Sequence, residues 1–280
     1  MAMKAPNYEQ IQSFNNVKDQ LQAAAVDEFT ESLYDGITYD EVLEEAVRIA
    51  EKYAMLGAEL GAQWYDLCSD LAGLDVEPAL VDETDTDALE AKAQAAFEKS
   101  QQPTVQGVFN DYLQNVINES IRKTGDANLW RDYERGLAGG RWCRVPVGET
   151  CAWCLMLASQ GAWYLTEKSA LGGEAGHYHN GCNCIAVYHA DASSIEGYTE
   201  LSKYKNMYYD ADNTRLANNQ GREKYPQELT DRVNAAKARH KLLEEKKQLE
   251  AEERGETYKQ KPWTVYNEDM IVMRYKYGLK

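Results

Sequence analysis

A capped apolar stripe in the first quarter of the chain constrains the fold more than any other feature. Thr38 and Glu41 have the spacing of a capping box, in which each side chain accepts a hydrogen bond from the other residue's backbone amide at a helix start. Apolar residues then recur every three or four positions: Val42, Ala46, Ile49, Tyr53, Leu56, Leu60, Trp64 and Leu67. This pattern predicts one face of a helix of about seven turns, which must be buried against other helices. Gly57 and Gly61 lie inside it and indicate close approach of a second backbone.

Other helices are expected around this one. Residues 7–33 form a polar helix, and residues 87–99 form a short alanine-rich helix. Pro103 suits the first turn of a further helix, because its missing amide donor would have no partner there in any case. That helix is expected to bury Val105, Phe109, Tyr112, Val116 and Ile121. Gly125 is expected to end it, before a brief turn with Trp130 and Tyr133.

The pattern changes in the middle of the chain. Residues 141–148 alternate in polarity and contain Pro146, which suits an edge strand. Residues 150–159 are expected to form a short helix, and residues 161–165 and 182–189 short strands. This middle segment therefore predicts a compact α+β unit.

The C-terminal part is more polar. Tyr204, Tyr208 and Tyr209 lie in a stretch that looks like a loop, and Pro226 begins a long charged helix that runs to about Arg254. The apolar residues of this helix are too sparse for a coiled coil, which favours a solvated spacer. Residues 263–277 have a β-type composition with a turn at 267–269, so a terminal hairpin is expected to act as an attachment arm.

Taken together, these patterns predict an α+β protein that is mostly α. It has an N-terminal helical bundle (1–125), a small Cys/His unit (126–190) and a C-terminal extension (191–280) with a long helix and a terminal β-hairpin.

The middle segment also carries the one cluster of reactive side chains. Cys151 and Cys154 form a C-x2-C pair, and His179 and Cys182 form an H-x2-C pair. Two such pairs separated by a loop are a common way to build a structural zinc site. We expect these four residues to bind Zn²⁺, with Cys184 able to replace His179 and His177 a weaker substitute. A segment this small would gain folding energy from the metal.

Two other interpretations of the cluster stay open. The residues could be plain thiols or disulfides, or Cys154 could be a nucleophile with His179 as its base. Nothing in the sequence supplies a third group that would orient His179 as a base. A zinc ion with four protein ligands also has no open coordination position for a substrate. Arg144 either pairs with an acid or lies solvated on the surface, and Cys68 is expected to be a small buried apolar residue.

Charge is distributed unevenly. The net charge is −16, and residues 1–100 account for all of it with 22 acidic and 6 basic residues. No cluster of lysine and arginine suits a nucleic-acid surface. The acidic part instead suggests solubility, repulsion from packaged DNA or docking onto a basic protein. No stretch of about 18 apolar residues predicts a membrane span, and no signal pattern precedes Asn15, so we expect a protein made in a cytosol.

A run of motifs in the middle segment resembles a known family. Its parts are Arg144-Val145-Pro146, Gly148, Cys151 to Ser159, Gly161-Ala162 and Tyr178 to Cys184. This run is similar to the signature of MuF-like phage minor head (head morphogenesis) proteins, in the variant found in phages of actinobacteria. The similarity covers about residues 126–190 and departs from the family at Cys143 and at Tyr188-His189.

The resemblance implies a role rather than a mechanism. Such proteins are encoded beside the portal, enter the procapsid in few copies and assist head assembly or DNA delivery. It therefore implies a minor capsid component located in the virion, with the portal protein and the major capsid protein as partners. Members of the group are often labelled capsid maturation proteases, and a cysteine-type protease is the alternative function.

Overall fold

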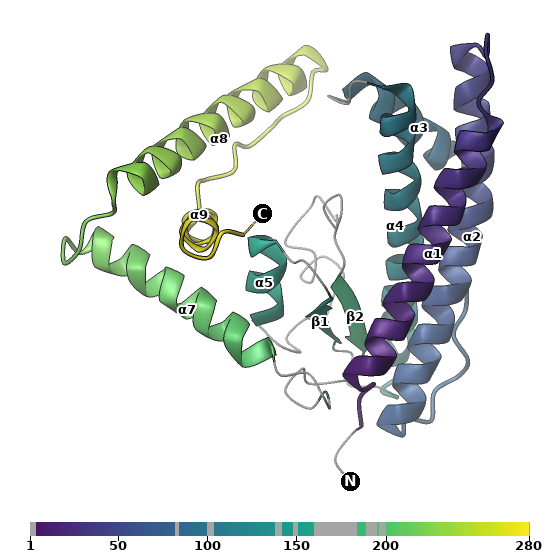
Figure 1. Cartoon of the computed structure of the whole chain (residues 1–280), viewed down its shortest axis with the longest axis horizontal. Helices are drawn as coiled ribbons and strands as arrows, with labels where there is room; N and C mark the ends of the chain where they lie inside the picture. The colour runs from purple at the N-terminus through teal and green to yellow at the C-terminus, as the bar shows by residue number, and fades with distance from the viewer. Residues whose placement is uncertain are drawn as a thin grey trace. The chain divides into compact units, whose positions relative to one another are not determined.

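The protein is mostly helical, with a two-stranded antiparallel sheet in the part of the chain that the computed structural model describes (Figure 1). That part comprises residues 4–81, 84–99, 104–137, 142–147, 151–159, 184–188, 195 and 200–279. No helix within these ranges is long and apolar enough to cross a membrane. The chain forms two compact units, residues 1–149 with 160–198 and residues 150–159 with 199–280. The three-part division by sequence stays a prediction.

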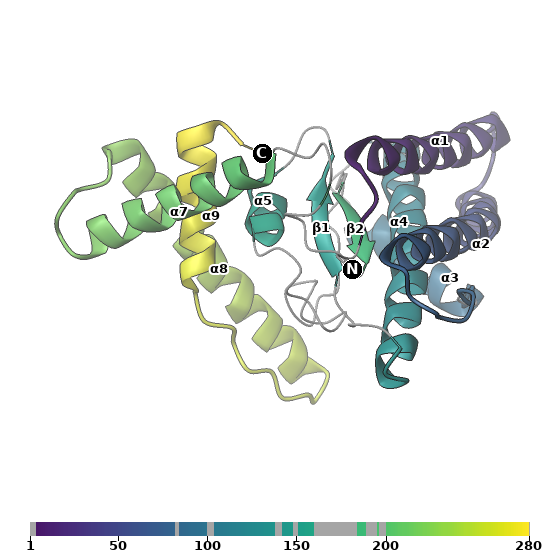
Figure 2. The ribbon, with the colours of Figure 1, turned by 90° about the horizontal axis from the view of Figure 1, so that it is seen from below.

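The first unit is built on a bundle of helices. Its members are α1 (Tyr8–Ser32), α2 (Tyr39–Ala72), α3 (Thr86–Lys99) and α4 (Val105–Glu134), and Figures 1 and 2 both show α1, α2 and α4 side by side. The predicted capping box starts α2, because the Thr38 amide donates to Glu41 Oε2 at 2.8 Å and the Glu41 amide to Thr38 Oγ1 at 3.3 Å. The bundle core contains Phe29, Val42, Ala46, Ile49, Tyr53, Leu89, Phe109, Leu113, Val116 and Ile117.

The glycines of α2 allow the backbone of α4 to approach closely, as the sequence predicted. A methyl group at Gly61 would lie 3.0 Å from both Cα and the carbonyl carbon of Ile121, and nearer still to its oxygen. At Gly57 the nearest atom would be the carbonyl oxygen of Ile117 at 3.1 Å. Because α2 packs against a backbone here, the residues that it buries between positions 57 and 62 are glycines and alanines. Leu67, which the sequence predicted on the buried face, is 36% exposed.

The prediction that Gly125 ends a helix is wrong. Helix α4 continues through Gly125 to Glu134, so Trp130 and Tyr133 belong to the same helix and not to a separate turn. A methyl group at Gly125 would lie 2.9 Å from Cε2 of Tyr188 and closer to its hydroxyl. Gly125 therefore makes room for an aromatic ring, which is a packing role that no local pattern reveals.

The sheet packs on the same unit. Strands β1 (Trp142–Pro146) and β2 (Cys184–Tyr188) pair antiparallel with Arg144 opposite Ala186, which confirms two of the predicted strands. The predicted strand at 161–165 lies outside the described residues. Trp64 donates its indole N–H to the carbonyl of Ala186, and the rings of Tyr65 and Tyr188 meet edge to face at 5.3 Å. Strand β2 is thereby fixed against α2.

The second unit contains α5 (Ala152–Ser159), α7 (Glu200–Asn219), α8 (Gln227–Glu253) and α9 (Val265–Tyr277). Helices α5 and α8 confirm the sequence prediction, including the start of α8 at Pro226. The loop expected around Tyr204 and Tyr208 is instead α7, because these tyrosines pack on one apolar cluster. The buried members of that cluster are Ala152, Leu155, Ala211, Leu229, Val233, Val272 and Met273.

The prediction of a terminal β-hairpin is also wrong, because residues 265–277 form helix α9. Figure 2 shows α9 beside α7 and α8. The expected turn residue Asn267 caps the helix by accepting the Thr264 amide at 3.1 Å. Val272 and Met273 are buried one turn beyond Glu268 and Asp269. Asp269 accepts from Arg215 Nε at 2.6 Å and Glu268 accepts from the Tyr225 hydroxyl at 3.1 Å, so both buried acids can lie on the inner face of the helix. A hairpin attachment arm is therefore not formed by these residues.

Candidate functional site

The C-x2-C pair lies at the start of α5. Cys151 precedes the helix, its carbonyl accepts the Leu155 amide at 3.1 Å, and its Sγ accepts the Cys154 amide at 3.4 Å. Cys151 therefore takes the position of an N-cap, with sulfur in place of the usual side-chain oxygen. Amide donors and the positive end of a helix favour the thiolate form of a cysteine. The local geometry thus suits a thiolate metal ligand.

The placement of the remaining predicted ligands relative to this pair is not given by the described structure. His179 and Cys182 lie outside the described residues, as does His177. Cys184 is the first residue of β2 and belongs to the other compact unit. Within the described ranges, no group of three or more histidine, cysteine or acidic residues could hold a metal ion. The zinc site therefore stays a prediction. Of its expected ligand pairs, the structure describes the first, Cys151 and Cys154.

The other candidate side chains that the structure describes are buried. Cys154 is 1% exposed and Arg144 is also 1% exposed, so the surface interpretation of Arg144 is wrong. Cys68 is fully buried as expected, and burial raises the pKa of its thiol to about 12. Cys68 is therefore protonated and unreactive at neutral pH, which agrees with a packing role.

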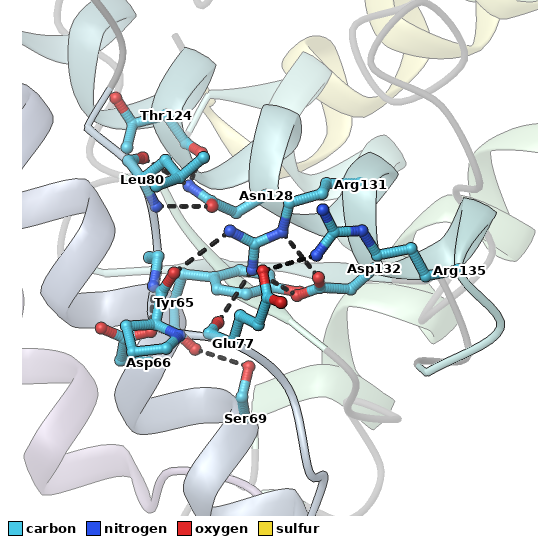
Figure 3. A network of polar contacts seen from close by, with 12 residues as sticks. Tyr65, Asp66, Ser69, Glu77, Leu80, Thr124, Asn128, Arg131, Asp132 and Arg135 are labelled. Carbon is cyan, nitrogen blue, oxygen red and sulfur yellow. Dashed lines mark hydrogen bonds and ion pairs between the residues drawn. The ribbon is translucent and has the colours of Figure 1, made fainter.

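A polar network that the sequence analysis did not predict joins the ends of α2 and α4 (Figure 3). At its centre, Asp132 is completely buried and accepts from Arg131 Nε at 2.7 Å and from the Tyr65 hydroxyl at 2.8 Å. Burial disfavours the charged form of Asp132, but the hydrogen bonds from Arg131 and Tyr65 outweigh it, so the pKa of Asp132 is lowered. Burial and the bond to Asp132 raise the pKa of Tyr65. Asp132 is thus held as a carboxylate and Tyr65 as a neutral phenol.

The same network holds the loop that follows α2. Arg131 donates to the carbonyls of Glu77 at 2.8 Å and Pro78 at 3.1 Å (Figure 3). Asn128 exchanges two hydrogen bonds of 2.8 Å with the backbone of Leu80. Side chains of α4 therefore satisfy the loop's backbone groups where no regular structure does. The arrangement anchors a loop, which gives it a structural role.

A small cavity lies between the bundle and β2. Its volume is about 20 Å³, and Lys18, Trp64, Arg122 and Cys184 are among its lining residues. Such a volume can hold a single water molecule and no organic substrate.

Comparison with known proteins identifies relatives. Residues 5–211 match the family model described as VG15 protein. The Gene 15 protein of Mycobacterium phage D29 is 32% identical over 97 residues, which cover 25% of this chain and 35% of that protein. The match thus spans about a third of that relative's length. No solved structure matches the chain.

Proposed function

The chain belongs to the VG15 protein family, and from its similarity to a phage protein we propose that it is a minor capsid protein of a phage head. In this proposal it is a MuF-like head morphogenesis protein that sits beside the portal in the virion. The portal protein and the major capsid protein are its partners. It acts as a structural component and catalyses nothing.

The observation that carries the proposal is the Cys151–Cys154 pair inside the MuF-like run of motifs. The family match spans this pair, and the sulfur of Cys151 accepts an amide at a helix start. That donor arrangement fits one half of a closed tetrahedral zinc site. We assign the ligands as Cys151, Cys154 and Cys182, with His179 or Cys184 as the fourth. A zinc ion bound there would add folding energy to the middle segment.

Elemental analysis tests the metal assignment. Protein purified without chelator is expected to contain about one zinc per chain. Cys151→Ser is expected to lose the zinc and to lower the melting temperature. Cys68→Ala is the matched control, because Cys68 is a buried cysteine outside the ligand set, and it should retain zinc. Wild-type protein without metal would contradict the assignment.

The alternative of a cysteine-type capsid maturation protease makes a different prediction. Its nucleophile would be Cys154, which is 1% exposed, whereas reactive cysteines are accessible. We therefore expect phage carrying Cys154→Ser to process the major capsid protein normally wherever the variant folds. Loss of processing by a folded, zinc-containing Cys154→Ser protein would favour the protease.

A further inference from the structure

Exposed aromatic side chains lie at the end of the helical bundle where α1 stops and α2 starts (Figure 1). Tyr34, in the loop between these helices, is 59% exposed, and Tyr39, the first residue of α2, is 40% exposed. The ring of Tyr39 lies 4.4 Å from that of Phe97, near the end of α3. Phe97 in turn stacks on the buried ring of Phe109. We call Tyr34, Tyr39 and Phe97 the aromatic tip, which is continuous with the bundle core through Phe109.

The chain around the aromatic tip is acidic. Residues 19–47 contain nine acidic residues and no lysine or arginine. The exposed acids that surround the turn from α1 to α2 are Glu31, Asp35, Asp40 and Glu44. None of these four forms an ion pair with a residue that the structure describes. The next basic residue along the chain, Arg48, pairs with Glu28 and Glu45 instead. The tip therefore combines exposed rings with carboxylates whose charge is not compensated within the described chain.

An aromatic ring and a carboxylate of this surface are already in contact. The side chain of Tyr34 hydrogen-bonds to that of Glu41, and the negative charge of Glu41 raises the pKa of Tyr34. Both side chains are exposed. A guanidinium suits such a pair, because it stacks on an aromatic face while its N–H groups donate to a carboxylate. A lysine ammonium forms the ion pair but has no planar group to stack. The chemistry of the tip therefore favours arginine as the binding partner.

We infer that the aromatic tip docks onto an arginine-bearing surface of another protein. Arginines of that partner would stack on Tyr34 and Tyr39 and pair with the surrounding carboxylates. A two-fold contact between the tips of two copies is disfavoured, because both tips are acidic and like charges repel. Nucleic acids and anionic lipids are disfavoured for the same reason. The inference goes beyond the proposed function, because it assigns a surface and a class of partner that do not depend on the metal site.

Fluorescence anisotropy of a labelled peptide tests the inference on the full chain. The probe is a peptide of about twelve residues in which arginine alternates with serine, and its counterpart has lysine in place of arginine. We expect the arginine peptide to bind. The lysine peptide should bind at least about threefold more weakly, because it keeps the charge but loses the stacking on the rings. Affinity for both peptides should fall as salt is added.

An aromatic variant locates the binding site. Tyr34→Ala should weaken binding of the arginine peptide about tenfold, because aromatic anchors contribute much of the binding energy of an interface. Met55→Ala is the matched control, since Met55 is 52% exposed on the same bundle. It lies roughly 24 Å along α2 from Tyr39. Met55→Ala should change the affinity less than about twofold.

A pair of charge variants separates the tip from the general acidity of the bundle. The double variant Glu31→Gln with Asp35→Asn should weaken binding at least about threefold at low salt. Its matched control is Glu9→Gln with Glu59→Gln, which removes the same charge from exposed acids elsewhere on α1 and α2. The control should change the affinity less than about twofold. Circular dichroism confirms that every variant is folded.

Absence of binding, or equal affinity for the arginine and lysine peptides, would overturn the inference. Equal effects of Tyr34→Ala and Met55→Ala, or of the two double variants, would do so as well, because binding would then reflect net charge alone. Self-association of the chain that Tyr34→Ala abolishes would make a second copy the occupant. The assay involves neither zinc nor capsid processing, so it can fail while those experiments support the proposed function, and the reverse also holds.

Discussion

Replacing Gly61 by alanine should separate α2 from α4. The new methyl group would lie 3.0 Å from two backbone carbons of Ile121 and closer to the carbonyl oxygen, whereas carbon atoms in contact prefer about 3.5–4.0 Å. Because the obstacle is backbone and not the end of a flexible side chain, α4 must retreat by roughly 0.5–1 Å.

The magnitude follows from two opposing effects. Overpacking of this kind costs about 1–3 kcal/mol, and backbone displacement places Gly61→Ala near the upper end. Alanine gains about 1 kcal/mol over glycine from helix propensity. The expected net loss in the free energy of unfolding is about 2 kcal/mol, a large share of the stability of an ordinary domain.

Gly57→Ala is the matched control, four residues earlier on the same helix. Its methyl group would lie 3.1 Å from the Ile117 carbonyl oxygen and 3.5 Å from the next atom, so a small adjustment suffices. The propensity gain then offsets the crowding, and stability should stay within about 0.5 kcal/mol of wild type. Urea unfolding followed by circular dichroism measures both variants. Gly61→Ala protein as stable as the Gly57→Ala protein would refute the close-approach argument.

Two further predictions concern the polar network and α9. Asp132→Asn should cost about 1–3 kcal/mol, because Arg131 loses its charged acceptor. The pKa of Asp132 is lowered in the folded protein. Its contribution to the free energy of unfolding is therefore fully present above the pKa of the unfolded state, about 3.9, and is lost as the pH falls through the lower pKa of the folded state. Urea unfolding at pH 7 and pH 3 should therefore show the two proteins converging in acid, and an unchanged difference would contradict this. Asn267→Ala should destabilise α9 by about 1 kcal/mol through loss of the acceptor for the Thr264 amide, seen as faster proteolysis after residue 255, and equal cleavage rates would argue against the cap.

Local chemistry in the sequence determined much of the helical framework. The Thr38–Glu41 box and the spacing of Val42 to Trp64 specify α2, because capping and helical periodicity depend on residues only a few positions apart. The same reasoning located β1, α5 and α8. It also placed Cys151 and Cys154 together, since the C-x2-C spacing lies within one helical turn.

Tertiary structure decided the features that depend on distant partners. Asp132 is 67 positions from Tyr65, and Asn128 is 48 from Leu80, so no local pattern joins them. Gly125 was predicted to end a helix, whereas its actual role is to make room for the ring of Tyr188. That ring comes from β2, which is distant in the sequence, so no local pattern reveals the role. Residues 265–277 looked like a hairpin because Asp269 is polar, yet Arg215 on α7 compensates its charge and allows it to face inward. Burial of a polar residue in a helix thus depends on a partner that only the folded chain supplies.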